Sequence, residues 1–364
     1  MPEVTLVMSV FNGELFLPAA LESIMAQSMR DFAIIVVNDG STDRTAEILE
    51  EYAGRSERMQ VVHQQNSGVV DAANRACALA RTPYIARMDA DDISLPDRLE
   101  RQLSFLQRRR EVALLGGAAE FINESGDVLF TVDVPTQHDE IKAILPERNV
   151  FVHSAVVMRR DALLAVGGYR RAFSDTAGDY DLWLRIVERY EAANLAEVIV
   201  RYRVHRRQTT TMRLEEQTLA AIGARLSARL RRSGRPDPFD AMNAVTRDTL
   251  IRLGMTAAEI EKEVATVAGS WANVMGEAGY HDTAVALARE AWRGPRGTGL
   301  TRDDVSRHHV AAARASLARG RIIRGLVAAA RAVRWQPALP GRMVRGGFRR
   351  IARWVRRRGG QPEM

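Results

Sequence analysis

Cysteine is nearly absent from this chain, and so are the signals of an exported or membrane-spanning protein. Cys77 is the only cysteine, so no intramolecular disulfide can form, which is consistent with a reducing cytosol. No run of about eighteen uninterrupted apolar residues occurs, so we expect no membrane-spanning helix. Residues 1–5 lack a basic segment and lead directly into a strand-like stretch, so we expect no signal peptide.

Acidic residues are missing from the C-terminal part of the chain, which concentrates the net charge of +7 there. From Arg321 to Arg358 every charged side chain is an arginine, and apolar residues such as Trp335 and Trp354 lie between them. Interfacial helices have this composition, so we predict contact with an anionic membrane surface. A solvated basic tail, packed or not on a neighbouring subunit, is the main alternative. Nucleic-acid binding is the least favoured reading.

The first half of the chain alternates strand and helix signals, a pattern typical of a parallel sheet covered by helices. Apolar, β-rich segments predict strands at residues 4–10, 32–37, 59–63 and 84–88. Apolar residues at helical spacing predict crossover helices between these strands. The expected fold class is therefore α/β.

The pattern changes after residue 92. Gly116-Gly117 and residues 123–126 have the composition of turns between shorter strands, which predicts a mixed or antiparallel extension of the sheet. Residues 151–158 and 196–205 are further strand candidates, and residues 179–189 are expected to be helical.

Strand signals disappear from about residue 214 onward, where alanine, arginine and leucine dominate. A chain of 364 residues favours two domains over one. We predict an α/β domain over residues 1–212, an α-helical domain over residues 213–315, and a basic amphipathic tail over residues 316–364.

Three clusters of carboxylates fall where parallel strands are expected to end. Ligands of open α/β sheets bind at the carboxyl ends of the strands, so this placement suggests a site for a cation or a polyhydroxylated ligand. Any one cluster alone would more simply be turn or cap chemistry. The clusters are Asp39, then Asp89 with Asp91 and Asp92, and then Asp179 with Asp181.

The segment Asp89-Ala90-Asp91 is a candidate metal site. Residues two apart in an extended segment point to the same side, so both carboxylates can face one ligand. A hard divalent ion is often held by one or two carboxylates, with phosphate oxygens and water completing the shell. Such an ion would neutralise charge on a diphosphate leaving group. The alternative is a solvated acidic turn before the helix that begins near Pro96.

A series of short motifs follows the chain in a distinctive order. The motifs are Val7–Asn12, Val37–Asp43, Ala73-Asn74, Met88–Asp92, His153-Ser154, Gly167–Tyr169, Gly178–Arg185 and Tyr202–His205. In order and spacing they resemble family 2 glycosyltransferases over about residues 3 to 210. The combination is specific, although a lone D-x-D would carry little weight.

The resemblance implies a GT-A fold, a Rossmann-like mixed sheet with helices on both faces, here followed by the helical domain. It implies an inverting, metal-dependent hexosyltransferase that uses a nucleoside diphosphate sugar, of UDP or dTDP type, and Mg²⁺ or Mn²⁺. The acceptor would be a glycan or a lipid-linked molecule in surface polysaccharide or lipopolysaccharide assembly. The location would be cytoplasmic, at the inner face of the membrane, and association into an oligomer stays open.

The resemblance also assigns roles at the donor site. Phe11 and Asp39 would face the base, and Asp89 the ribose. Arg203 and His205 resemble a flexible segment that closes over the diphosphate. The metal that bridges the two phosphates would be ligated by Asp91.

Asp179 matches the base that deprotonates the acceptor hydroxyl in the family. Direct displacement inverts the anomeric centre and needs one positioned base, which agrees with this match. Many relatives carry Glu-Asp here, whereas this chain has Gly178-Asp179, so acceptor contacts attributed to the glutamate are in doubt. Asp181 is the competing base, but residues two apart on a helix point in different directions, so both cannot face one hydroxyl.

Two rival functions make different demands on the sequence. A Rossmann-type dehydrogenase would carry G-x-G-x-x-G at its first strand–helix turn, and residues 9–14 do not. A catalytically inactive relative that acts as a binding or scaffold module would be favoured by loss of Asp91 or Asp179, and both are present. For His153 a structural role and an acceptor contact are equally open, while Trp183 is expected in the core.

Overall fold

The computed structural model describes residues 2–173, 177–293, 302–318 and 322–335. The chain forms two compact units, Met1–Met255 and Thr256–Met364, which are described separately. Within the described ranges, no helix combines the length and the apolar character needed to cross a membrane.

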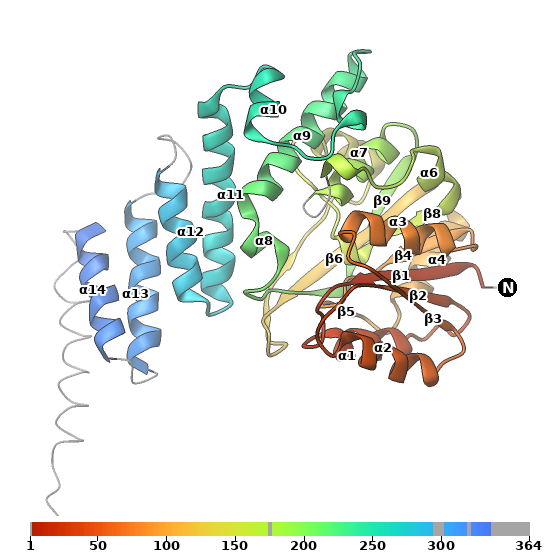
Figure 1. Cartoon of the computed structure of the whole chain (residues 1–364), viewed down its shortest axis with the longest axis horizontal. Coiled ribbons are helices and arrows are strands. Elements are labelled where there is room, and N and C mark those ends of the chain that lie inside the picture. The colour runs from red at the N-terminus through yellow and green to blue at the C-terminus, as the bar shows by residue number, and fades with distance from the viewer. Residues whose placement is uncertain (1, 174–176, 294–301, 319–321, 336–364) are drawn as a thin grey trace, which may run out of the picture. The chain divides into compact units, whose positions relative to one another are not determined.

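The first unit is built on a nine-stranded sheet. The strands are β1 Val4–Val10, β2 Ala33–Asp39, β3 Met59–Gln64, β4 Tyr84–Arg87, β5 Ile93–Ser94, β6 Val112–Ile122, β7 Val128–Val132, β8 Val157–Arg159 and β9 Glu191–Arg203. Their order across the sheet is β3-β2-β1-β4-β8-β6-β9-β5, and β7 pairs with β6 (Figure 1). The first four strands in this order are parallel, β8 is antiparallel to both of its neighbours, and β6 and β9 are parallel.

Helices cover both faces of this sheet and enclose a hydrophobic core on each. The helices of the unit are α1 Leu17–Met25, α2 Thr45–Gly54, α3 Val69–Leu79, α4 Arg98–Arg108, α5 His138–Ile144, α6 Arg160–Ala165, α7 Gly178–Val187, α8 Thr209–Met212, α9 Leu214–Arg232 and α10 Arg247–Arg252, with short 3₁₀ helices η1 His153–Ala155, η2 Arg171–Phe173 and η3 Pro238–Ala241. One core joins the sheet to α1, α2 and α4, and the other joins it to α3, α5, α6, α7 and α9. The predicted α/β class with helices on both faces is confirmed.

The parallel half of the sheet places three loops side by side. Strand β1 pairs along its length with β2, from Thr5 opposite Ala33 to Val10 opposite Asn38, and on its other side with β4. Its side chains are buried on both faces, which explains the continuous apolar run. The loops after β1, β2 and β4 therefore leave the sheet at one edge, and the predicted donor-site carboxylates lie there.

The antiparallel extension differs in detail from the prediction. The turn at residues 123–126 is confirmed between β6 and β7, but Gly116-Gly117 lies inside β6. A Cβ on Gly116 would lie 2.1 Å from Asn194 Oδ1, and one on Gly117 would lie 2.6 Å from Ile199. These glycines therefore permit close strand packing rather than a turn. The strand expected at residues 151–158 is a 3₁₀ turn followed by the short β8, and β9 begins earlier than expected.

The division between the units falls after Met255, whereas the loss of strand signals predicts an end of the first domain at residue 212. Helix α9 belongs to the first unit because its small residues pack into the core with α7, and Arg231 pairs with Glu188 at 2.8 Å. Because one face of α9 is buried in this core, the first unit extends beyond its last strand.

The second unit consists of helices in its described part. They are α11 Ala257–Glu277, α12 His281–Arg293, α13 Arg302–Ala318 and α14 Ile322–Trp335, and each packs against the next in sequence. Helix α11 begins with a capping box, in which Thr256 Oγ1 accepts from the Glu259 backbone N–H and the Glu259 carboxylate accepts from the Thr256 N–H. The predicted tail beyond residue 335 lies outside the described residues.

Candidate active site

The loop after β1 is fastened to the loop after β2 and presents Phe11. Asn12, with φ of 51°, donates its backbone N–H to Ser41 Oγ at 2.9 Å and accepts from the Thr42 N–H at 2.8 Å. Gly13 donates its N–H to Thr45 Oγ1 at 2.9 Å. Phe11, by contrast, is 52 % exposed. The ring of Phe11 is therefore held on a braced loop and is accessible to a planar ligand, as the predicted contact with a base requires.

Asp39 is buried and holds another loop. One carboxylate oxygen accepts from the Ser67 N–H and from Gln64 Nε2, and the other accepts from the Gly68 N–H at 2.9 Å. Gly40 follows with φ of +72°, where a Cβ would lie 2.6 Å from the Asn66 backbone nitrogen. The structure thus uses both oxygens of Asp39 to shape the edge of the site, and its contact with a base stays a prediction.

Asp89 lies between two cationic or polar partners at the end of β4. Its Oδ1 accepts from Arg87 Nη2 at 3.2 Å, and its Oδ2 lies 3.1 Å from His153 Nδ1. Burial by itself raises the pKa of this carboxyl, but His153 and Arg87 outweigh it and hold the pKa well below the ordinary value. Its side chain is still 31 % exposed, so an ionised carboxylate faces the site in a fixed orientation.

Asp91 and His205 meet across two segments that are distant in sequence. His205 Nε2 lies 2.9 Å from Asp91 Oδ2, and the His205 ring packs on Phe16 with centroids 4.8 Å apart. Asp91 is partly exposed, whereas His205 is buried behind it, and His205 Nδ1 has no hydrogen-bond partner among the described residues. The two side chains that the sequence assigned to the metal and the diphosphate thus form one pair.

Arg203 does not extend toward solvent as expected for a residue that closes over a diphosphate. It is 6 % exposed, and its guanidinium donates to the carbonyl oxygens of Asp91, Asn123 and Glu124 at 2.9 to 3.2 Å. Its backbone N–H donates to Asp92 at 2.8 Å. In this conformation Arg203, the last residue of β9, keeps its side chain inside the protein and braces the acidic loop.

Asp92, the third acid of the cluster, is buried and structural. It accepts from Ser154 Oγ as well as from Arg203 N–H. Burial and the neighbouring charges of Asp91 and Asp89 raise its pKa well above the ordinary value. Asp92 therefore fixes the loop to β9 and η1 and leaves Asp89 and Asp91 as the carboxylates that face the site.

Asp179 lies in the first turn of α7, where its carboxylate accepts a hydrogen bond from the Tyr180 backbone. Among the described residues, Asn149 Nδ2 contacts its side chain at the long distance of 3.5 Å. Burial raises the pKa of Asp179, and the negative charge of the nearby Asp89 acts in the same direction. The residue is thus a carboxylate near Asp89 whose affinity for a proton is increased.

Asp181 points into the protein. It is 0 % exposed and pairs with Arg170, which contacts both carboxylate oxygens, and with Arg185 at 2.9 Å. Arg170 also pairs with Asp237 and Asp240, which joins α7 to the segment after α9. Helical geometry separates Asp181 from Asp179 as the sequence analysis expected.

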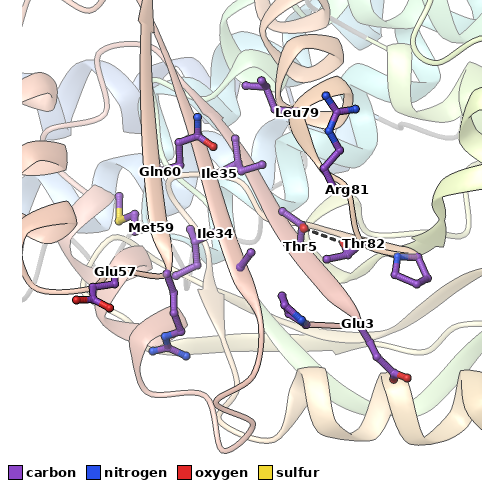
Figure 2. A pocket seen from close by; sticks show the side chains of 14 residues that line it. Glu3, Thr5, Ile34, Ile35, Glu57, Met59, Gln60, Leu79, Arg81 and Thr82 are labelled. Atoms are coloured by element: carbon purple, nitrogen blue, oxygen red, sulfur yellow. Dashed lines mark hydrogen bonds between the residues drawn. The ribbon is translucent and has the colours of Figure 1, made fainter.

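The hollow drawn in Figure 2 lies at the opposite edge of the sheet. It has a volume of about 550 Å³ and is lined at the amino ends of β1, β2 and β3 by residues such as Thr5, Ile34 and Met59. Thr5 hydrogen bonds to Thr82 at 2.7 Å there. None of the predicted site residues lines this hollow, so the carboxylate edge is the candidate active site.

Sequence reasoning missed the support beneath the carboxylates. Arg87 and Arg98 are both fully buried, and Arg98 donates to the carbonyl oxygens of Arg87 and Val156. Burial lowers the pKa of Arg98 to about 9, against the charges of Asp92 and Asp89. The sequence did contain a signal of this support, because Arg87 is a charged residue in an otherwise apolar strand.

A mixed sheet with acidic residues at the carboxyl ends of its parallel half, extended by antiparallel strands, defines the GT-A class of fold. Two solved structures share it. S. aureus TarS 1-349 in complex with UDP-GlcNAc matches with a TM-score of 0.52 and 13 % identity over 90 % of both chains. Mannosyltransferase PcManGT from Pyrobaculum calidifontis, in complex with GDP-Man and Mn²⁺, matches with a TM-score of 0.50 and 17 % identity over 90 % of this chain and 86 % of that one.

Sequence comparison specifies the family. The model of glycosyl transferase family 2 matches residues 5–167. O-antigen biosynthesis glycosyltransferase WbnJ of Escherichia coli is 30 % identical over 61 % of this chain and 87 % of its own. Amylovoran biosynthesis glycosyltransferase AmsE of Erwinia amylovora is 30 % identical over 55 % of this chain and 75 % of its own. The chain belongs to glycosyltransferase family 2, as its motifs predict.

Proposed function

We propose that the protein transfers a hexosyl group from a nucleoside diphosphate sugar to an acceptor hydroxyl with inversion at the anomeric carbon. The observation that supports this most strongly is the contrast between two nearby carboxylates. The pKa of Asp179 is raised by burial, whereas that of Asp89 is held low by His153 and Arg87. When two neighbouring acids have different pKa values because their environments differ, they typically have different roles. Here the acid with the raised pKa suits proton transfer, and the acid with the lowered pKa suits binding.

Asp179 would act as the general base. It takes the proton of the acceptor hydroxyl while the hydroxyl oxygen forms a bond to the anomeric carbon and the bond from that carbon to the diphosphate oxygen breaks. Asp89 is a poor candidate for a nucleophile, because both of its oxygens already have partners. With Asp179 as the base and Asp89 already engaged by Arg87 and His153, direct displacement, which inverts the centre, is favoured.

A divalent cation, Mg²⁺ or Mn²⁺, fits the pair formed by Asp91 and His205. A carboxylate oxygen and an imidazole nitrogen 2.9 Å apart can turn toward one ion, and the buried Nδ1 of His205 lacks a partner among the described residues. These residues contain no cluster of three or more metal-binding side chains, so diphosphate oxygens and water would complete the coordination. When bound, the ion neutralises charge on the leaving diphosphate.

Asp91→Asn should abolish the metal-dependent part of nucleotide binding, because a neutral amide replaces the partly exposed carboxylate that would ligate the ion. For the wild-type protein, saturating nucleoside diphosphate with Mn²⁺ should raise the melting temperature by about 5–10 °C, and EDTA should remove most of the rise. We would screen UDP, dTDP, GDP and CDP by thermal shift. Asp97→Asn, which removes a surface partner of Arg101, is the matched control.

The outcomes of this screen separate the two functions. A rise with one nucleotide in wild type and Asp97→Asn, but not in Asp91→Asn, supports the donor site and names its base. No rise with any nucleotide in the wild-type protein would favour a binding or scaffold module without transferase activity.

For the acceptor, we propose a glycan or lipid-linked molecule of a surface polysaccharide, handled at the inner face of the membrane. The relatives from E. coli and E. amylovora are named for O-antigen and amylovoran biosynthesis. Helix α14, the described part of the arginine-rich region, exposes Leu326 and Val327 together with Arg324 and Arg331. Exposed aliphatic and cationic side chains on one helix suit an anionic lipid surface.

Vesicle sedimentation tests the membrane contact. The full chain should sediment with vesicles that contain phosphatidylglycerol and stay in solution with pure phosphatidylcholine. Binding should weaken as salt rises, since each arginine at the surface contributes about 1 kcal/mol and is screened within a Debye length. Equal binding to both vesicle types, or none to either, would contradict the proposed contact.

A further inference from the structure

Four residues from separate segments form a continuous chain of contacts that ends on the donor-site carboxylate. The Asn74 amide in α3 bonds both backbone groups of Tyr169 at 2.9 Å. Tyr169 Oη lies 3.1 Å from His153 Nε2. His153 Nδ1 lies 3.1 Å from Asp89 Oδ2. The chain therefore ends on the carboxylate assigned to the ribose.

Arg87 determines which ring nitrogen of His153 carries the hydrogen. Arg87 Nε lies 3.1 Å from His153 Nε2 and always carries a hydrogen, so Nε2 must accept. The hydrogen of the neutral ring is then on Nδ1, where it donates to Asp89 Oδ2. The geometry thus gives His153 one direction of donation, toward Asp89.

The partners of His153 are rigid, whereas Asp89 is accessible. Arg87 is fully buried and also donates to the Val7 carbonyl at 3.3 Å. The His153 ring packs within 6.1 Å, centroid to centroid, of both Tyr169 and the fully buried Trp183. Without His153, the 31 % exposed side chain of Asp89 would be held by Arg87 at Oδ1 alone, and Oδ2 would no longer have a fixed position. His153 is thus fixed by the core and in turn fixes the orientation of the Asp89 carboxylate in the site.

We propose that His153 is a positioning residue for the donor, whose Nδ1–H holds Asp89 in the orientation that accepts the ribose hydroxyls. This inference rests on the proposed function, because it assumes a nucleotide donor at Asp89. It gives His153 no contact with the acceptor and no proton-transfer role, since its acceptor nitrogen faces Arg87 and Tyr169. The effect should fall on donor affinity rather than on the chemical step.

Two amide substitutions at this one position separate the two ring nitrogens. In His153→Asn the side-chain amide can occupy the place of Nδ1 and still donate to Asp89. In His153→Gln the longer amide reaches the place of Nε2 and keeps the contact with Arg87, but it leaves Asp89 Oδ2 without a donor, so that Arg87 Nη2 holds the carboxylate at Oδ1 only. We expect donor KM and nucleotide Kd to rise about 10–100-fold in His153→Gln, as for other supporting partners of a binding group, with kcat close to wild type. His153→Asn should stay within about threefold of wild type.

A purely structural role predicts a different result. It would lower the melting temperature of both variants and affect KM and kcat together, without distinguishing asparagine from glutamine. Tyr169→Phe serves as the control, because it removes one contact of Nε2 and leaves the bond to Asp89 intact. Equal donor affinity in the two amide variants would overturn the proposal, and so would a loss confined to kcat.

A measurement on the wild-type protein keeps the test independent of the folding of any variant. Multiple-bond ¹⁵N spectra of histidine-labelled protein report the tautomer of each ring, and the signal of His153 can be assigned by its absence in His153→Asn. We expect the Nδ1–H tautomer, and an Nε2–H tautomer would overturn the proposal. If the wild-type protein binds no nucleoside diphosphate, the proposed function fails instead, whatever the tautomer.

Discussion

Asp179→Asn is expected to lower kcat by about 10²–10⁴-fold, the usual contribution of a general base. The amide has nearly the same shape as the carboxylate but cannot take the acceptor proton. Nucleotide binding should stay near the wild-type value, because the donor-site side chains Asp89 and Asp91 are unchanged. Steady-state turnover of the donor identified by thermal shift, together with nucleotide Kd, checks both parts.

The pH dependence of kcat provides a second test of the same residue. Burial raises the pKa of Asp179, and a base is active only when deprotonated. Activity should therefore fall as the pH drops through this raised pKa, at a higher pH than for an exposed aspartate, and the residual activity of Asp179→Asn should lack that limb. Turnover at the wild-type rate in Asp179→Asn would remove this residue as the base.

The parallel half of the sheet was predictable because strands that are buried on both faces consist of continuous runs of apolar residues. Strand β1 runs from Val4 to Val10 as expected, since nearly all of its side chains are buried. Gly116-Gly117 was misread as a turn because glycine serves two purposes, a turn and a close approach. Only the position of Asn194 and Ile199 on the neighbouring strand reveals the second. Long-range packing of this kind has no local sequence signal.

The site shows the same limit at the level of side chains. Sequence motifs identified residues that the fold brings to one edge, including Asp89, Asp91 and His205. They could not show which polar atoms are already occupied by protein partners. Both carboxylate oxygens of Asp39 accept hydrogen bonds from the loop at residues 64–68, and the Arg203 guanidinium donates to the acidic loop. The support from Arg87 and His153 is equally invisible, because hydrogen-bond partners 66 residues apart are set by the tertiary fold.

Asp181→Asn should destabilise the first unit by about 3–5 kcal/mol, the cost of removing one partner from a buried ion pair. Asp181 is 0 % exposed, and the guanidinium groups of Arg170 and Arg185 converge on its two oxygens. A neutral amide would leave these nearly buried cations, 11 % and 8 % exposed, with too little negative charge. Urea unfolding followed by tryptophan fluorescence measures the change, because Trp183 lies two residues away in α7.

Two controls show whether the loss of stability arises because Asp181 is buried or because any carboxylate is removed. Asp240→Asn removes a carboxylate that pairs with the same Arg170 but is 71 % exposed, so it should cost less than about 1 kcal/mol. Asp179→Asn, on the same helix, should unfold near the wild-type midpoint while losing turnover. Asp181→Asn should show the reverse, a lower midpoint with turnover retained by the folded fraction. If Asp181→Asn kept its stability and lost turnover, Asp181 would become the base, and the buried ion pairs would have to open during the reaction.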